Sequence, residues 1–303
     1  MSGQIRKQPE DFIVIEDLGF QPSGEGEHAY LQVEKRNANT SWVAWRIAEF
    51  AGIREMDVGY AGRKDRHAIT TQWFSCYLPG QPDPDWAQFS AEGVQLKQAT
   101  RHGGKLRPGD LAGNRFELLV RMDAPDPTQQ AALEIRLSRL AEEGFPNYFG
   151  AQRFGRDDQN LEAADRLLRR GERVRGDRGM LISAARSALF NHYLSNRLAA
   201  GSPGDDVGPL YGRSRDPQPG ESELNDIQAG WVAGLRRLKA KAATRPLMAR
   251  PGGLNWRWLE QGLKLEFELG AGSYATSLLR ELFLVEDLSL ADGGNDNSLE
   301  AKT

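Results

Sequence analysis

Strand patterns occur near both ends of the chain, and a mainly helical stretch separates them. The clearest pattern is in residues 263–269 (LKLEFEL), where leucine and phenylalanine alternate with lysine and glutamate. This period of two is typical of a half-buried strand in an antiparallel sheet. Residues 12–15 and 29–33 also have strand character, whereas residues 128–143 have a helical pattern that stops at Gly144. The two ends of the chain can therefore contribute strands to one sheet.

The middle of the chain has a different character. Its segments are rich in arginine and alanine and are helical by pattern, and they surround residues 199–222, whose Gly, Pro, Ser and Asp content is typical of a loop. We predict an α+β fold in which residues 1–143 and 246–303 form one domain. A second, mainly helical domain, residues 144–245, is inserted into it.

Composition excludes several classes of protein. The 303 residues suffice for one large or two ordinary domains, and 39% hydrophobic with 27% charged residues is ordinary for a globular chain. No apolar run reaches the roughly 18 residues that a membrane span needs, and the N-terminus lacks the apolar core of a signal peptide. We therefore expect a cytoplasmic protein that has no contact with membranes. Cys76 is the only cysteine and the 4 histidines are scattered, so we expect no disulfide and no metal site.

Positive charge is concentrated in two runs, although the formal net charge is −3. One run lies within residues 101–115. The other holds six arginines within thirteen residues: Arg166, Arg169, Arg170, Arg173, Arg175 and Arg178. Each run can be a solvated face, but two such runs favour a partner that carries phosphate groups.

One carboxylate stands among cations. Asp65 lies in the string GRKDRHA, between Lys64 and Arg66 and close to Arg63 and His67. A carboxylate with so many cations nearby is expected to stay ionised, and an ionised carboxylate can act as a nucleophile or a base. Spacing alone favours the other interpretation, a surface turn with incidental ion pairs.

Two further motifs are ambiguous by themselves. Gly270, Gly272 and Ala275 match the GxGxxA pattern of dinucleotide-binding folds, but too little chain follows them for a second strand and an acidic ribose ligand. The pattern instead indicates a tight turn that brings Tyr274 and a helix start to a site, unless Tyr274 only caps the core. In residues 147–155, aromatic side chains alternate with glutamine and arginine, which suits either base stacking or a buried junction.

These segments together resemble the TruD family of tRNA pseudouridine synthases, in the order of the family and over most of the chain. The matching strings are residues 8–20 (QPEDFIVIEDLGF), 23–28 (SGEGEH), 60–74 (YAGRKDRHAITTQWF), 113–116 (GNRF), 146–155 (PNYFGAQRFG), 183–191 (SAARSALFN) and 270–282 (GAGSYATSLLREL). The resemblance implies the pseudouridine-synthase fold, a mixed and largely antiparallel sheet with flanking helices, interrupted by a TruD-specific domain. Compared with the family, the stretch after Leu198 is short, which predicts a compact insert.

The resemblance also implies an activity and a substrate. The family isomerises uridine 13 in the D stem of tRNA: the bond from uracil N1 to the ribose is broken, the base rotates, and C5 is joined to C1′. This reaction needs no metal or organic cofactor. We therefore expect tRNA as the partner of a monomer that requires no other protein.

Particular residues fall on functional positions of the family. Asp65 falls on the catalytic aspartate, and Arg6 falls on a basic position near that carboxylate. Four residues fall on positions that line the uridine pocket: Phe12, Asn114, Phe116 and Tyr274. Arg169, Arg170 and Arg173 are the arginines that we expect to hold the RNA backbone.

Two other classes of function compete with this hypothesis. An RNA-binding protein of the same fold without catalysis would not need Asp65. A glycoside hydrolase would pair Asp65 with a second carboxylate about 5 to 10 Å away and would release free base or sugar.

Overall fold

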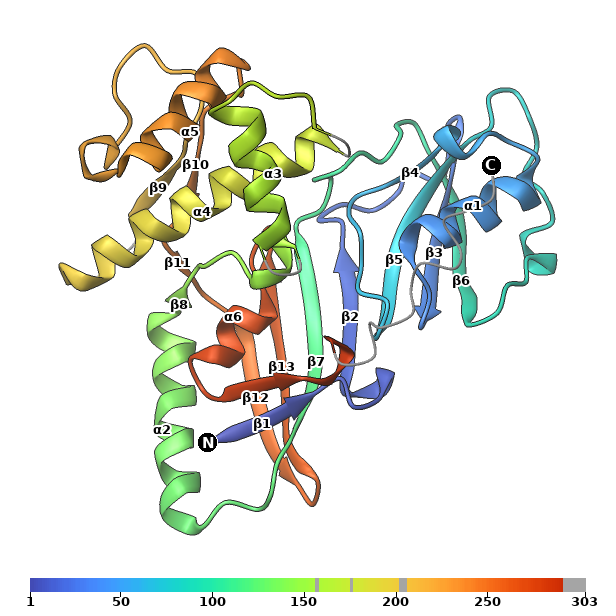
Figure 1. The fold of residues 1–303 in the computed structure, drawn as a ribbon. Helices are drawn as coiled ribbons and strands as arrows, with labels where there is room; N and C mark the ends of the chain where they lie inside the picture. Colours follow the sequence, from blue (N-terminus) through green and yellow to red (C-terminus); the bar gives the residue numbers. More distant parts are fainter. Residues whose placement is uncertain (156–157, 175–176, 202–205, 291–303) are drawn as a thin grey trace. The chain divides into compact units, whose positions relative to one another are not determined.

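The computed structural model describes residues 1–155, 158–174, 177–201 and 206–290. The chain forms two compact units, drawn in Figure 1. The first consists of Met1–Ala141, Pro251–Gly272 and the described residues from Leu282 onward, and the second of Glu142–Arg250 and Ser273–Glu281. Within the described ranges, no helix combines the length and the apolar character needed to cross a lipid bilayer.

The first unit is built on one ten-stranded sheet, with the strand order β12-β13-β7-β2-β5-β3-β6 along its main path. Neighbouring strands on this path are antiparallel except for the parallel pair β2 and β5, so the predicted mixed, largely antiparallel sheet is confirmed. Three short strands join from the sides: β1 pairs with β14 and β7, and β4 pairs with β5. The strands are β1 (Ser2–Ile5), β2 (Phe12–Asp17), β3 (His28–Arg36), β4 (Val58–Tyr60), β5 (Ile69–Tyr77), β6 (Val94–His102), β7 (Gly113–Arg121), β12 (Gly252–Leu259), β13 (Gly262–Gly270) and β14 (Leu284–Asp287).

Alternation in residues 263–269 gives β13 its buried face. Leu263, Leu265, Phe267 and Leu269 are at most 2% exposed, as their spacing predicts. β13 pairs along its whole length with β7, so strands from the two ends of the chain are neighbours in the sheet. The register places Phe267 opposite Phe116, and the two rings stack with centroids 5.3 Å apart.

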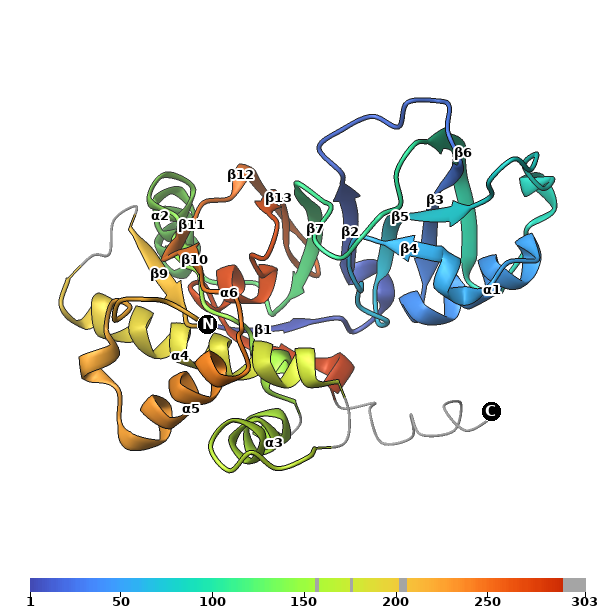
Figure 2. The ribbon, with the colours of Figure 1, turned by 90° about the horizontal axis from the view of Figure 1, so that it is seen from above.

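Two long helices cover parts of this sheet. Helix α1 (Thr40–Ala51) lies against β3, β4 and β5 (Figure 1 and Figure 2). It buries Val43 and Ile47 in a core shared with these strands. It ends at Gly52, whose φ of 65° is the left-handed conformation that glycine adopts without strain. Helix α2 (Pro127–Glu143) is tied to β12 by a hydrogen bond of 2.9 Å from the Trp258 indole to Glu134. Helix α2 lies where the sequence predicts a helix.

The second unit is mainly helical. Its helices α3 (Gln159–Leu168), α4 (Arg178–Ala199) and α5 (Asp226–Arg237) share a core that includes Leu168, Leu189 and Leu235. A Cβ atom on Gly234 would lie 2.3 Å from the carbonyl oxygen of Leu168, so α5 approaches α3 closely at this glycine. The remaining elements of the unit are α6 (Ala275–Arg280), β8 (Phe145–Pro146), β9 (Val207–Leu210), β10 (Ala243–Pro246) and β11 (Met248–Ala249). Short 3-10 helices complete the chain: Pro9–Asp11, Glu55–Asp57, Trp86–Gln88, Ala151–Phe154, Glu221–Glu223 and Leu288–Leu290.

The second unit differs from the predicted insert at its edges. We expected residues 246–303 to belong wholly to the first domain, whereas Ser273–Glu281, with Tyr274 and α6, packs with the second unit. One reason is that the Ser277 hydroxyl donates a hydrogen bond of 2.9 Å to the carbonyl oxygen of Tyr148. Strand alternation ends before α6, so the sequence pattern contained no sign of this exchange.

Strand β4 admits no side chain at Gly59. A Cβ atom there would lie 2.3 Å from the carbonyl oxygen of Leu106 and 2.7 Å from Oγ of Ser75, whereas no atom lies within 4 Å of a Cβ on Gly62. We therefore expect Gly59→Ala to lower the free energy of unfolding by about 1–3 kcal/mol. Gly62→Ala, the matched control, should change it by less than about 0.5 kcal/mol. Urea denaturation of both variants measures this difference, and equal stabilities would contradict the packing at Gly59.

Candidate active site

Asp65 lies in the loop between β4 and β5, and the backbone of this loop is held by side chains below it. The main-chain N–H of Lys64 donates to the hydroxyl of Thr40 (3.0 Å), and the same hydroxyl donates to the Gln72 side chain (2.9 Å). The Gln72 amide nitrogen donates in turn to the carbonyl oxygen of Gly62 (3.2 Å). The backbone is thereby fixed, while the Asp65 side chain remains 38% exposed and accessible to a substrate.

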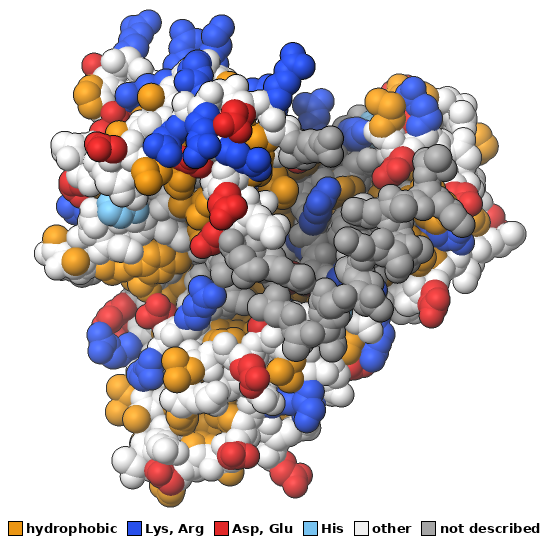
Figure 3. Space-filling model, in the orientation of Figure 1, with side chains coloured by type: hydrophobic (Ala, Val, Ile, Leu, Met, Phe, Trp, Pro, Cys, Tyr) orange, Lys and Arg blue, Asp and Glu red, His pale blue; other side chains and the backbone are white. Residues whose placement is uncertain are grey.

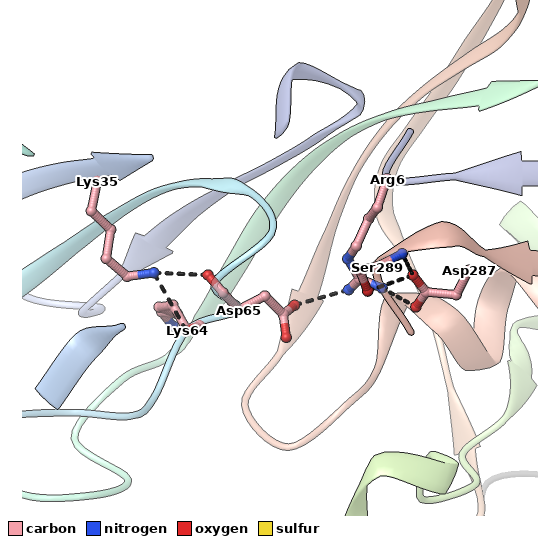
Figure 4. Close-up of polar contacts among 6 residues, drawn as sticks. All are labelled: Arg6, Lys35, Lys64, Asp65, Asp287 and Ser289. Atoms are coloured by element: carbon pink, nitrogen blue, oxygen red, sulfur yellow. Dashed lines mark hydrogen bonds and ion pairs between the residues drawn. The ribbon is translucent and has the colours of Figure 1, made fainter. Parts of the chain in front are cut away.

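A buried guanidinium binds the Asp65 carboxylate. Nη2 of Arg6 donates to Oδ2 of Asp65 at 2.9 Å, and Nη1 donates to the carboxylate of Asp287 (Figure 4). Asp287 is itself held by the hydroxyl of Ser289 at 2.7 Å. The Arg6 side chain is only 3% exposed, so this cation cannot turn out into solvent and stays beside Asp65.

Phe12 lies beneath the guanidinium, and Phe116 packs against Phe12. The Arg6 guanidinium is 3.7 Å from the centre of the Phe12 ring, and Phe12 meets Phe116 edge to face at 6.3 Å. Both phenylalanines are buried, and Phe267 covers one face of the Phe116 ring. These rings support Arg6 from the core of the sheet.

Asn114 belongs to a second polar group beside the loop. Nζ of Lys64 lies 2.9 Å from Oε2 of Glu16 and donates to the side-chain oxygen of Asn114 at 2.5 Å. The Glu16 side chain is fully buried and also accepts a hydrogen bond of 3.0 Å from the main chain of Trp73. The Asn114 side chain is thereby oriented, and its amide nitrogen is a donor that can serve another partner.

Lys35 holds the loop from within the sheet. It is fully buried, and its Nζ donates to the main-chain oxygen of Asp65 at 2.8 Å and to that of Lys64 at 3.4 Å (Figure 4). Burial lowers the pKa of Lys35 to about 8.

Among the residues that the structure describes, no group of three or more His, Cys, Asp or Glu side chains is placed to hold a metal ion.

Sequence reasoning missed Glu16, Lys35 and Asp287. For the first two a signal was present, because each occupies an inward position of an alternating strand, after Val14 in β2 and after Val33 in β3. A charged residue at such a position breaks the pattern and requires a buried partner. Asp287 had no comparable signal, since its partner Arg6 is 281 residues away along the chain.

Tyr274 lies in the second unit, directly before α6. Its phenol oxygen accepts a hydrogen bond of 2.7 Å from Nη2 of Arg153, and its ring centre is 5.9 Å from that of Phe149. The guanidinium of Arg245 lies 5.9 Å from the centre of the Tyr274 ring and is largely buried. This burial lowers the pKa of Arg245 to about 10. Tyr274 is therefore an ordered aromatic side chain within its own unit.

The predicted RNA-binding arginines also lie in the second unit, at the end of α3 and in the segment after it. Nε of Arg169 is 2.5 Å from a carboxylate oxygen of Asp165, whereas Arg170 lies 3.9 Å from the same carboxylate and is 60% exposed. Arg173 is exposed and makes no ion pair with any residue in the described part of the chain. Figure 3 shows lysine and arginine side chains gathered over the α3 and α5 end of this unit. Arg175, from the same run, lies outside the described residues.

Comparison with known proteins places the chain among relatives of similar length. The family model of tRNA pseudouridine synthase D (TruD) matches residues 1–173. The chain is 42% identical to the tRNA pseudouridine synthase D of Cellvibrio japonicus, covering 98% of this chain and 94% of the relative. It is 38% identical to that of Aeromonas salmonicida, covering 99% and 95%.

A solved structure shares the fold. The crystal structure of the putative tRNA pseudouridine synthase D from Methanosarcina mazei superposes with a TM-score of 0.65 at 19% identity, covering 93% of each chain. The family model spans more than half of this chain, and the two bacterial relatives cover nearly all of it. On this basis, and in agreement with the motif around Asp65, the chain belongs to the tRNA pseudouridine synthase D (TruD) family.

Proposed function

We propose that this protein isomerises a uridine within tRNA to pseudouridine, that uridine 13 of the D stem is its substrate, and that Asp65 is the catalytic residue. The observation that carries the proposal is the pairing of an accessible Asp65 carboxylate with the buried Arg6 guanidinium, in the loop that matches the family motif. A cytoplasmic location, where tRNA is modified, is part of the proposal.

The geometry supports two roles for Asp65. Arg6 binds Oδ2, so we assign the other oxygen, Oδ1, to the substrate. As an anion, Asp65 either adds to C1′ of the ribose or removes the proton at C2′, and each route breaks the bond from C1′ to N1. After the uracil rotates, C5 joins C1′. In the first route the bond from Asp65 to C1′ breaks in this step, and in the second route Asp65 returns the proton to C2′. The C5 proton then leaves, and N1 carries a proton in the product. Arg6 orients the carboxyl group of Asp65 through its hydrogen bond to Oδ2.

Recognition of the uridine is assigned to neighbouring side chains. The base must leave its stack in the tRNA, which costs a few kcal/mol, and stacking on an aromatic ring returns about 1–3 kcal/mol per contact. We assign hydrogen bonding of the base to Asn114, whose amide Lys64 orients. Phe12 and Phe116 support Arg6 and border the site from the core. A stacking role for Tyr274 remains a prediction from the family resemblance.

Asp65→Asn tests the assignment of the catalytic residue. The amide retains the shape of the carboxylate but cannot act as nucleophile or base, so we expect the single-turnover rate of pseudouridine formation to fall by at least about a hundredfold. The affinity for tRNA should change little. Asp57→Asn is the control, because Asp57 makes an exposed ion pair with Arg54. A variant at position 65 that keeps most of the wild-type rate would remove Asp65 from catalysis. A wild-type protein that binds tRNA but forms no pseudouridine would favour an RNA-binding protein without this activity.

Asp287→Asn tests whether the second carboxylate holds Arg6 on Asp65. Loss of a hydrogen bond to a charged group costs about 1.5–3 kcal/mol, so we expect kcat to fall roughly 10- to 100-fold. Glu286→Gln removes the same charge from the same strand, and this exposed residue contacts Gln4 instead of Arg6. Its kcat should equal that of the wild type. If both substitutions lower kcat equally, net charge matters and the contact of Asp287 with Arg6 does not.

The arginines after α3 generate a prediction about salt. If they contact tRNA phosphates, Arg173→Ala should weaken tRNA binding and make the slope of log Kd against log salt shallower by about 0.7–0.9. Arg169→Ala should change the slope less, because Asp165 already neutralises that side chain. The control is Arg257→Ala, an exposed arginine on β12. If wild type, control and an Arg169, Arg170, Arg173 triple alanine variant share one slope, these arginines are a solvated face.

A further inference from the structure

Lys35 is a charged residue at a position that otherwise belongs to the core. It follows Leu31 and Val33 on the inward face of β3, and all three are 0% exposed. Lysine is almost never fully buried unless it is paired with an anion. Among the described residues, however, no carboxylate lies within ion-pair distance of its ammonium group, which donates to the main-chain oxygens of Lys64 and Asp65.

This arrangement lowers the stability of the folded protein. The pKa of Lys35 falls from 10.5 to about 8, chiefly because burial removes water from the ammonium. The negative charge of Asp65 opposes this shift and the positive charge of Lys64 adds to it. Between these two values the unfolded chain binds more protons than the folded one. Lys35 therefore destabilises the folded state increasingly as the pH falls from 10.5 towards 8, and fully below that.

An aliphatic side chain would fill the same place without this cost. Replacement of a buried charge by an apolar group of similar volume is often neutral or stabilising. Departures from local sequence rules that lower stability are concentrated at functional sites. Both hydrogen bonds of the ammonium are to the loop that carries Asp65, so a function of this buried charge would act through that loop.

We propose that Lys35 is a positioning residue, which fixes the main-chain oxygens of Lys64 and Asp65 and thereby directs the Asp65 carboxylate toward the substrate. The inference rests on the proposed function of Asp65. Two cations bind different parts of Asp65. Arg6 binds its carboxylate, and Lys35 binds the carbonyl oxygens of the two peptide groups that flank its Cα. Charge strengthens these hydrogen bonds, because an ionised donor binds a carbonyl oxygen about twice as strongly as a neutral one.

Lys35→Met is the principal test. It keeps an unbranched side chain of similar length but removes the donor and the charge. We expect kcat for pseudouridine formation to fall roughly 10- to 100-fold, while KM for tRNA changes little, because Lys35 has no exposed surface. The Tm should be unchanged or higher than that of the wild type.

The pH profile separates positioning from mere packing. Wild-type kcat should decline as the pH rises through about 8, where Lys35 loses its proton, whereas Lys35→Met should lack this decline. The charged groups that act on Lys35 are Lys64 and Asp65, and both remain in the variant. Lys97→Met on the neighbouring strand β6 is the control, since Lys97 is partly exposed and paired with Glu34, and it should keep the wild-type kcat and pH profile.

The outcomes are distinct. A Lys35→Met protein with wild-type kcat and pH profile overturns the inference, as does a loss of activity that only follows a lower Tm. If Lys35→Met does not fold, Lys35→Gln is the deciding variant, because it keeps an N–H donor without the charge. A kcat between those of wild type and Asp65→Asn, at an unchanged Tm, supports the positioning role. A wild-type kcat overturns it. A wild-type protein that forms no pseudouridine overturns the proposed function itself, and this inference with it.

Discussion

The contact of Arg6 with two carboxylates is the interaction on which the arrangement around Asp65 depends. A buried guanidinium has lost its hydration and is stabilised by anionic partners, and those of Arg6 come from the β4–β5 loop and from β14. The contact therefore requires both ends of the chain to be in place before Asp65 is oriented. Because Arg6 is shared with Asp287, it binds Asp65 at Oδ2. No other residue in the described part of the chain pairs with the second oxygen, which suits the catalytic role proposed for this carboxylate.

Sheet register places the remaining groups. β2 pairs with β7 so that Glu16 lies opposite Asn114, and Lys64 from the loop contacts both. β2 is also parallel to β5, and a parallel pair requires a crossover connection. In this chain the crossover contains β3, α1 and β4 and ends in the loop that carries Asp65. The loop thereby returns to the N-terminal end of β2, where Ile13 lies opposite Ile69. A slip of one residue in β2 would turn Glu16 and Phe12 to the opposite face.

Much of the fold could be predicted from local patterns. The end of α2, the buried face of β13 and the division into a sheet unit and a helical unit follow from periodicity and from Gly144. The predicted residues Arg6, Phe12 and Asp65 do lie together, but their identification depended on the family resemblance, since Asp65 alone was compatible with a surface turn. Tyr274 was expected within the sheet domain but packs with the helical unit. The sequence did not reveal this, because the hydrogen bond that ties α6 to that unit, from Ser277 to Tyr148, leaves no periodic pattern.

By itself, the sequence determined which segments are strands and helices, that both termini contribute to one sheet, and that a lone aspartate stands among cations in a glycine-containing loop. These features are local, because they depend on the period of apolar residues and on turn chemistry. Tertiary structure alone decided that Asp287 is the second anion of Arg6 and that Lys35 is buried beneath the loop. Such contacts depend on strand register and on desolvation, and these exist only after segments distant in the chain have packed together.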